Sequence, residues 1–276
     1  MKATYLDHMG SDLDVVNAAR VSFGQKSTYE SHLVSEFYGE NDYVEREWES
    51  RLKEKDRKLI EYLARGMTTS EWDDFLTELR MDFYKDHDEE VVDLLWKWRN
   101  TPTHETPFGH CYAKFHVKAP IFVRSQLVKH EFLRMSEISR RYVTSDPEFY
   151  MPDVWRGKPE KGKSKQGSSG EVTKMGSPLA DMSVRDFVEV VSEMSLHNYQ
   201  ELLASGVAPE QARMVLPQSM YTEWIWSGSL DAFCQMCRLR LGCDAQEETR
   251  QIARQVYDKL LELFPVSAEA LVEGVK

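Results

Sequence analysis

The side chains best suited to binding chemistry lie in one stretch of the chain, from Gln126 to Tyr142. This stretch holds four cations, two carboxylates, two seryl hydroxyls and a histidine. Arginine presents a planar fork of N–H donors to phosphate oxygens, while glutamine and serine can hydrogen-bond a sugar or the edge of a base. The stretch therefore fits a phosphorylated ligand, although an exposed helix end crossed by ion pairs would have the same composition.

A second stretch, from Gly157 to Ser164, matches the G-x-x-x-x-G-K-[ST] pattern of phosphate-binding P-loops. That pattern binds phosphate only between an apolar strand and a helix, because the helix N-terminus and the loop amides supply the donors. Neither flank has that character. We interpret the match as chance within a mobile surface loop, from Arg156 to Pro178, that is rich in Lys, Gly and Ser.

The cysteine spacing does not predict a metal site. Cys234 and Cys237 form a C-x-x-C pair with Cys243 further on, but a closed zinc site needs four ligands and no fourth is near. The pair falls in an expected helix, where both thiols can pack in the core. The chain also lacks G-x-G-x-x-G, which argues against a Rossmann dinucleotide-binding domain.

The elements that must position the polar stretch follow from hydrophobic periodicity. Apolar and polar residues alternate over 113–119, which predicts a half-buried strand. Pro120 suits the first turn of a helix, which we predict to run to Leu133. Such a helix would place Gln126, Lys129 and His130 on one face.

The rest of the chain is predicted to be mostly helical. Capping-box patterns at Ser70 with Asp73 and at Ser183 with Asp186 indicate two helix starts. The sequence thus predicts an α/β (α+β) protein, a helix-rich single domain with a central mixed or antiparallel sheet. Further helices are expected over 12–23, 45–67, 88–98, 229–239 and 244–264, with a strand over 221–226.

Composition narrows the functional classes. The chain has 276 residues and a formal net charge of −11, which opposes binding to nucleic acid. No apolar run reaches the length of a membrane span, and the first residues lack a signal-peptide core. Four cysteines are too few for a disulfide scaffold, so we expect a cytoplasmic protein.

The polar stretch resembles the signature of the flavin-dependent thymidylate synthases, which is Arg-His-Arg, seven residues and a serine. Lys129-His130-Glu131 stands for the first three residues, and Ser139 and Arg141 follow in step. Lys129 keeps the positive charge but loses the fork, and Glu131 reverses the charge.

Other segments resemble further motifs of this family, in the family's order. Several ordered matches are far more specific than one short motif. The resemblance implies the family's fold in one domain over 1–276, with insertions near 25–100 and 156–178. The matching segments are 17–23, 104–110, 118–123, 212–217, 221–222, Trp226, 239–240 and 245–250.

The resemblance implies a dUMP site. Arg141 and Arg213 would bind the phosphate, while Arg240 would be the catalytic residue that polarises the pyrimidine and stabilises charge on it. The positions carried over for dUMP are Gln126, Leu127, Val128, Lys129, Glu137, Ile138, Ser139, Arg140, Arg141, Arg213 and Arg240.

The resemblance also implies an FAD site. The family usually has asparagine and arginine where Ser229, Asp231 and Gln235 stand, and the Asp231 carboxylate would repel a pyrophosphate. The positions carried over for FAD are Ser22, His104, Thr106, Lys129, His130, Glu131, Glu137, Ser229, Leu230, Asp231 and Gln235.

The implied enzyme is a homotetramer with shared active sites that converts dUMP to dTMP. Its carbon donor is 5,10-methylenetetrahydrofolate, NADPH reduces its FAD, and Ser139 positions a ligand without attacking it. Three alternatives stay open: a flavoenzyme that leaves a hydroxymethyl group, a non-catalytic nucleotide-binding homologue, and a nucleic-acid-binding protein, which the net charge disfavours.

Overall fold

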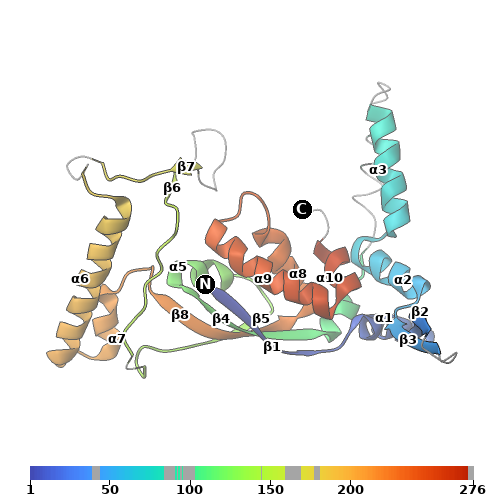
Figure 1. Cartoon of the computed structure of the whole chain (residues 1–276), viewed down its shortest axis with the longest axis horizontal. Coiled ribbons are helices and arrows are strands. Elements are labelled where there is room, and N and C mark those ends of the chain that lie inside the picture. Colours follow the sequence, from blue (N-terminus) through green and yellow to red (C-terminus); the bar gives the residue numbers. More distant parts are fainter. Residues whose placement is uncertain are drawn as a thin grey trace.

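A four-stranded antiparallel sheet forms the centre of the molecule in a computed structural model (Figure 1). The structure describes residues 1–38, 44–83, 91, 93, 95, 103–143, 145–158, 169–176 and 181–272. The antiparallel pairing confirms the predicted sheet type. In spatial order the strands are β1 (Lys2–Met9), β4 (Tyr112–Pro120), β8 (Tyr221–Ser229) and β5 (Leu133–Glu137).

The two central strands bury one face. In β4, Phe115 and Val117 are fully buried while the intervening His116 is not, as the alternation over 113–119 predicts. In β8, Trp224 and Trp226 are buried at 1% and 0% exposure. Bulky aromatic side chains on one face need a covering layer, which the C-terminal helices provide.

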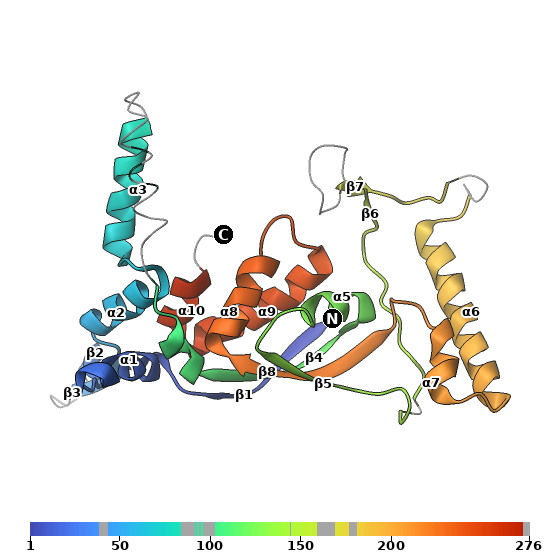
Figure 2. The ribbon, with the colours of Figure 1, turned by 180° about the vertical axis from the view of Figure 1, so that it is seen from behind.

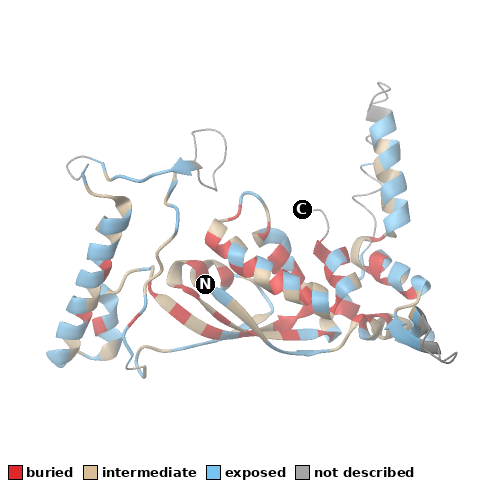
Figure 3. Cartoon of the chain, in the orientation of Figure 1, coloured by how far each residue is buried: buried red, intermediate tan, exposed pale blue. Residues whose placement is uncertain are grey.

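Three helices cover that face: α8 (Leu230–Arg240), α9 (Glu247–Leu263) and α10 (Pro265–Val272) (Figures 1 and 2). Phe233 of α8 packs edge-on against Phe115 and Trp226, with ring centroids 5.3 and 5.2 Å apart. Figure 3 shows the buried residues concentrated between these helices and the sheet. The sequence did not predict α10, which follows α9 after one residue, Phe264.

After β1 come α1 (Asp12–Arg20) and the 3-10 helix η1 (Val21–Phe23), which confirm the predicted helix over 12–23. A hairpin of β2 (Glu30–Tyr38) and β3 (Val44–Arg51) follows, then α2 (Glu54–Arg65) and α3 (Thr69–Phe83). The predicted helix over 45–67 is therefore wrong in its first part. The backbone of β3 pairs with β2, and cross-strand pairs such as Arg46 with Glu36 at 2.6 Å replace helical neighbours.

The start of α3 also differs from the prediction. Thr68, not Ser70, caps the helix: its hydroxyl accepts from the N–H of Glu71 at 3.3 Å. The carboxylate of Glu71 in turn accepts from the N–H of Thr68 at 2.7 Å, which completes a capping box. The helix predicted over 88–98 lies almost wholly outside the described residues, of which Val91, Asp93 and Leu95 are helical.

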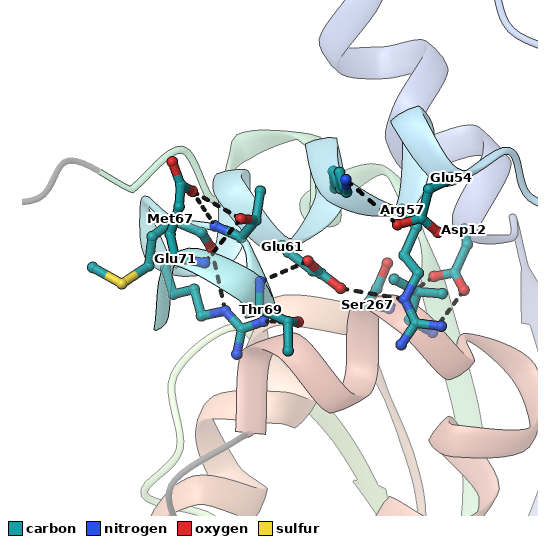
Figure 4. Close-up of polar contacts among 12 residues, drawn as sticks. Asp12, Glu54, Arg57, Glu61, Met67, Thr69, Glu71 and Ser267 are labelled. Carbon is teal, nitrogen blue, oxygen red and sulfur yellow. Dashed lines mark hydrogen bonds and ion pairs between the residues drawn. The ribbon is translucent and has the colours of Figure 1, made fainter. Parts of the chain in front are cut away.

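A polar junction fastens these N-terminal helices to the C-terminal layer (Figure 4). Asp12 is 5% exposed, and its carboxylate accepts from the N–H groups of Val266 and Ser267 at 2.9 and 3.0 Å, at the start of α10. Burial raises the pKa of Asp12, and these hydrogen bonds oppose the rise. Nearby, Glu61 of α2 accepts from the N–H of Thr69 at 2.9 Å, which holds the start of α3.

The remaining elements surround the sheet: η2 (Thr106–His110), α5 (Ile121–Leu127), β6 (Arg156–Gly157), β7 (Ser169–Glu171), α6 (Val184–Ala204), α7 (Pro209–Ala212) and η3 (Arg213–Val215). Ser183 caps α6 as predicted, since its hydroxyl accepts from the N–H of Asp186 at 3.0 Å. Part of the apolar stripe of α6 is uncovered, with Val191 41% and Met194 60% exposed. Among the helices that the structure describes, none is long and apolar enough to cross a membrane.

Candidate functional site

A short arch of chain, residues 128–132, carries Lys129-His130-Glu131, the first three residues of the motif found in the sequence (Figure 2). The helix predicted to reach Leu133 ends at Leu127, and β5 begins at Leu133. Phe132 ends the arch with a left-handed backbone, φ 61°, so the chain cannot continue as a helix there. Gly228 of β8 lies against the arch, because a Cβ there would come within 2.9 Å of the Phe132 carbonyl oxygen.

The arch brings His130 to the last residue of α8. Arg240 donates from Nε to Nε2 of His130 at 2.9 Å and from Nη2 to the backbone oxygen of Gln126 at 3.4 Å. Its Nη1 has no partner among the described residues. Three of the predicted site residues, from two distant parts of the sequence, therefore meet around one guanidinium.

The imidazole of His130 is neutral in this arrangement. Burial, together with the positive charge of Arg240, lowers its pKa to about 4. A neutral ring can accept from the guanidinium, whereas a protonated ring would repel it. Arg240 itself stays charged, although burial lowers its pKa.

The side chain of Gln126 is held by α9. Its Oε1 accepts from the hydroxyl of Thr249 at 3.1 Å, and its Nε2 donates to Oε1 of Gln246. Gln246 donates to Glu248 at 3.1 Å, and Glu248 pairs with Arg156 at 2.5 Å. Sequence reasoning gave Gln246, Glu248 and Thr249 no role, although the motif match over 245–250 marked the segment.

Glu137 is the last residue of β5. Its carboxylate pairs with Arg124 of α5 at 2.8 Å and accepts from the Thr222 hydroxyl at 2.8 Å. Arg124 was not predicted as a site residue. Its contact shows that Glu137 is neutralised within the chain and is not free to bind a cation.

The residues proposed for the phosphate lie elsewhere, near α7. Nε of Arg141 is 3.9 Å from Oε2 of Glu210 in α7, and Arg213 begins η3 directly after α7. Both arginines are exposed. They share one neighbourhood, but no contact among the described residues joins them to Arg240.

The other predicted dUMP residues have mixed surroundings. Ser139 accepts from the N–H of Arg141 at 3.3 Å, and Arg140 donates to the backbone oxygen of Ser145 at 2.5 Å. Leu127 is fully buried, so it presents no exposed surface to a ligand. Val128, Lys129, Glu131 and Ile138 are exposed.

The predicted FAD residues fall into two sets, of which the first is Lys129, His130, Glu131 and Glu137. The second set lies around η2, which contacts both α1 and α8. His104 and Thr106 are exposed, as is Ser22 in η1. Leu230 is fully buried, and its N–H donates to the oxygen of Cys111 at 2.8 Å. Ser229 precedes α8 without a side-chain capping bond, and Gln235 is exposed.

The surroundings of Asp231 indicate which part of a flavin nucleotide this second set could fit. Its Oδ1 is buried without a partner among the described residues, so it is an acceptor that needs a donor. Hydroxyl and N–H groups of a flavin nucleotide can donate to it, while the pyrophosphate would be repelled. Ser22 and Thr106 are exposed residues, and the Ser22 hydroxyl, which donates to the Ala19 oxygen at 3.1 Å, can still accept. The set therefore fits the ring or ribose portion of such a cofactor.

The thiols offer no alternative chemistry. Cys111, Cys234 and Cys237 are buried and free, and Cys243 is exposed. Burial raises the pKa of Cys111 to about 12 and raises those of Cys234 and Cys237. Within the described ranges no group of three or more His, Cys, Asp and Glu residues could hold a metal ion.

Known proteins of similar sequence share one description. The profile of the Thy1 family, "Thymidylate synthase complementing protein", matches residues 4–266. A "Flavin-dependent thymidylate synthase" of Thermus thermophilus is 37% identical over 191 residues, which are 68% of this chain and 66% of that protein, just under two thirds of it. A protein of the same name from Anaplasma marginale is 30% identical over 271 residues, 97% of this chain and 70% of that protein.

A solved structure has a fold similar to that of this chain. The crystal structure of a UMP/dUMP methylase, PolB from Streptomyces cacaoi bound with 5-Br dUMP, matches with a TM-score of 0.62. The two sequences are 27% identical, and the match covers 98% of this chain and 93% of that one. The likeness extends over the whole chain, including the N-terminal segment and the region around α6.

Proposed function

This chain belongs to the thymidylate synthase complementing family, the flavin-dependent thymidylate synthases, and from that membership we propose that it methylates dUMP to dTMP. The carbon comes from 5,10-methylenetetrahydrofolate, and the reducing equivalents come from NADPH through FAD. The observation that carries this proposal is the guanidinium of Arg240, held between neutral His130 and Gln126 with Nη1 available.

Arg240 would bind a carbonyl oxygen of the pyrimidine through Nη1. Its positive charge then stabilises negative charge that develops on the ring when C5 becomes nucleophilic. The hydrogen bond from Nε to His130 fixes the guanidinium plane, so the donor is oriented before the substrate arrives. Gln126, held by α9, would supply a further donor and acceptor to the base.

FAD, when bound, supplies the hydride that completes the methyl group. The chain's own part is to hold that cofactor: support comes from the exposed residues Ser22 and Thr106 and from the unpartnered Oδ1 of Asp231. Lys129 and His130 of the arch would contact it from the side of Arg240. The remaining positions for FAD are His104, Glu131, Glu137, Ser229, Leu230 and Gln235.

No nucleophilic side chain is required. Ser139 would position the nucleotide, because its hydroxyl accepts from the N–H of Arg141 and has no histidine partner among the described residues. Arg141 and Arg213 would bind the phosphate. Two exposed guanidinium groups in one neighbourhood suit a dianion better than either would alone.

We also propose that the active protein is a homotetramer with sites shared between subunits. The two sets of FAD residues support this: α8 is eleven residues long, so Asp231 and Arg240 lie about 14 Å apart along it. The uncovered Val191 and Met194 of α6 offer apolar contact area. Light scattering behind size exclusion should give four chains, whereas a monomer that keeps activity would refute shared sites.

The domain and location predictions remain part of this proposal. We treat 1–276 as a single catalytic domain in which 25–100 and 156–178 are insertions. The extent of the family match, over 4–266, supports one domain. Four free cysteines support a reducing cytoplasm.

Product analysis tests the function. The protein is incubated with FAD, NADPH, methylenetetrahydrofolate and dUMP, each omitted in turn, and the nucleotide is identified by mass. UMP is tested in parallel because the similar solved structure is described as a UMP/dUMP methylase. A product heavier by one methylene that needs all four components supports the proposal. A hydroxymethyl product, or none, would contradict it.

A further inference from the structure

One buried carboxylate ends a chain of hydrogen bonds that reaches the proposed base site. Glu248 is 5% exposed, and its Oε1 lies 2.5 Å from Nη2 of Arg156. Its Oε2 accepts from Nε2 of Gln246 at 3.1 Å. Beyond Gln246 the next member is the side chain of Gln126, a residue whose backbone oxygen accepts from Arg240.

The chemistry of the carboxylate fixes the direction of this chain. A carboxylate has only acceptors, and one oxygen of Glu248 already faces the guanidinium of Arg156. Gln246 must therefore turn its NH₂ group toward Glu248. Its carbonyl oxygen then faces Gln126.

The orientation of the Gln126 amide follows from that of Gln246. Because Gln246 presents a carbonyl oxygen, Gln126 must donate with its NH₂ group, and its own oxygen accepts from Thr249 at 3.1 Å. No other partner of this side chain occurs among the described residues. One N–H and one lone pair of Gln126 therefore remain, in a set orientation, for a ligand.

We propose that Glu248 is a specificity-determining positioning residue that locks the amide of Gln126 in the orientation that reads uracil and rejects cytosine. This inference rests on the proposed function. Uracil presents N3–H as a donor beside a carbonyl acceptor, which pairs with the oxygen and the N–H of Gln126. Cytosine has an acceptor at N3 and a donor at its amino group, so the same geometry needs the amide turned by half a rotation.

Gln126, Gln246 and Glu248 form a hydrogen-bonded relay. The rotation is unfavourable as long as this relay is intact. It would set the NH₂ group of Gln126 against the threonine hydroxyl and its oxygen against the oxygen of Gln246. Two facing acceptors repel, and a rotation of Gln246 as well would set its oxygen against the Glu248 carboxylate. Glu248 thus influences recognition of the base indirectly, through Gln246 and Gln126.

The test compares two nucleotides and four forms of the protein. Calorimetric titration of the flavin-loaded protein gives dissociation constants for dUMP and dCMP, and their ratio is the readout. Glu248→Gln replaces the acceptor-only group by an amide that accepts Gln246 in either orientation. Gln246→Leu breaks the relay but leaves the pair of Glu248 with Arg156 in place, so it serves if the first variant is poorly folded.

A matched control comes from the adjacent position. Glu247→Gln makes the same chemical change on the same turn of α9, where the carboxylate pairs with Arg250 at 3.0 Å outside the relay. Thermal unfolding of all four forms is recorded beside the titrations. A purely structural role of Glu248 would lower the melting temperature without changing the ratio.

We expect the wild-type protein and Glu247→Gln to prefer dUMP by at least about tenfold. In Glu248→Gln and Gln246→Leu the preference should fall by at least about fivefold, through tighter dCMP binding, weaker dUMP binding or both. A wild-type preference that both relay variants retain would overturn the inference and leave the proposed function intact. A wild-type protein that binds neither nucleotide would overturn the proposed function, and the inference with it.

Discussion

Arg240 donates its Nε hydrogen to Nε2 of His130 at 2.9 Å, so a permanently charged guanidinium uses a histidine as its acceptor. The contact is possible only while the imidazole is neutral. Burial and the charge of Arg240 keep it so by lowering the pKa of His130 to about 4. The donor proposed for the pyrimidine is therefore oriented by a group that does not titrate near neutral pH.

This relationship makes folding stability depend on pH in a defined window. In the unfolded chain His130 titrates near 6.5, whereas in the folded protein its pKa is about 4. Between these values the unfolded chain binds more protons, so the contribution is fully present above pH 6.5 and is lost as the pH falls toward 4. Urea unfolding between pH 7.5 and 4.5 measures it.

The control for that experiment is His130→Gln, which keeps a neutral acceptor that does not titrate. The difference in unfolding free energy between the wild-type protein and this variant should shrink as the pH falls through the window. A difference that stays constant with pH, or grows in acid, would contradict a neutral His130.

Replacing Arg240 should remove catalysis more than binding. Arg240→Gln keeps a hydrogen-bond donor but loses the positive charge, so we expect kcat for dTMP formation to fall by about 10²–10³. Arg238→Gln on the same helix, at an exposed position, should retain nearly full activity. Equal losses in both variants would show that the effect comes from helix α8 in general.

The packing of α2 against α1 is predicted to depend on one buried ion pair. Asp56 of α2 is fully buried, and Arg20 at the end of α1 contacts it through Nε and Nη2 at 3.1 and 2.5 Å. Asp56→Ala leaves Arg20 and the hydroxyl of Ser27 without their acceptor, so it should cost about 3–5 kcal/mol of stability. Urea unfolding provides the measurement.

An exposed pair supplies the comparison. Glu49 contacts Arg51 at 3.2 Å with both side chains more than half exposed, so Glu49→Ala should cost less than about 1 kcal/mol. Similar costs for Asp56→Ala and Glu49→Ala would mean that the buried pair does not anchor α2.

Thiol labelling checks the interpretation of the C-x-x-C pair. Of the four cysteines, only Cys243 is exposed, and burial raises the pKa of Cys111, Cys234 and Cys237. A thiol reagent at pH 8 should therefore label one residue in the native protein and four after denaturation. Rapid native labelling of Cys234 or Cys237 would revive a redox or metal role for the pair.

Local signals predicted the elements whose stability is local. The alternation over 113–119 gives β4, and the pattern of Ser183 with Asp186 gives the start of α6, because in both cases neighbours in sequence set the geometry. The charged segment 45–51 has no such signal. Its partner strand β2 decides its conformation, and a helix period cannot reveal that pairing.

Only part of the candidate site could be predicted from the sequence. Composition marked the stretch from Gln126 to Tyr142, but the left-handed Phe132 that ends the arch leaves no trace in hydrophobic periodicity. Gln126 and Arg240 are 114 positions apart and meet through the fold, so only the family resemblance could join them. The relay through Gln246 and Glu248 could be recognised only in the structure, because it depends on the direction of each hydrogen bond.

Reductive methylation of dUMP at this site can be followed in a single turnover without NADPH. Protein whose bound FAD has been reduced beforehand is mixed under argon with one equivalent each of dUMP and methylenetetrahydrofolate. Flavin absorbance and nucleotide mass are followed together. One dTMP should form for each flavin reoxidised; flavin that stays reduced beside unchanged dUMP would contradict the proposed function.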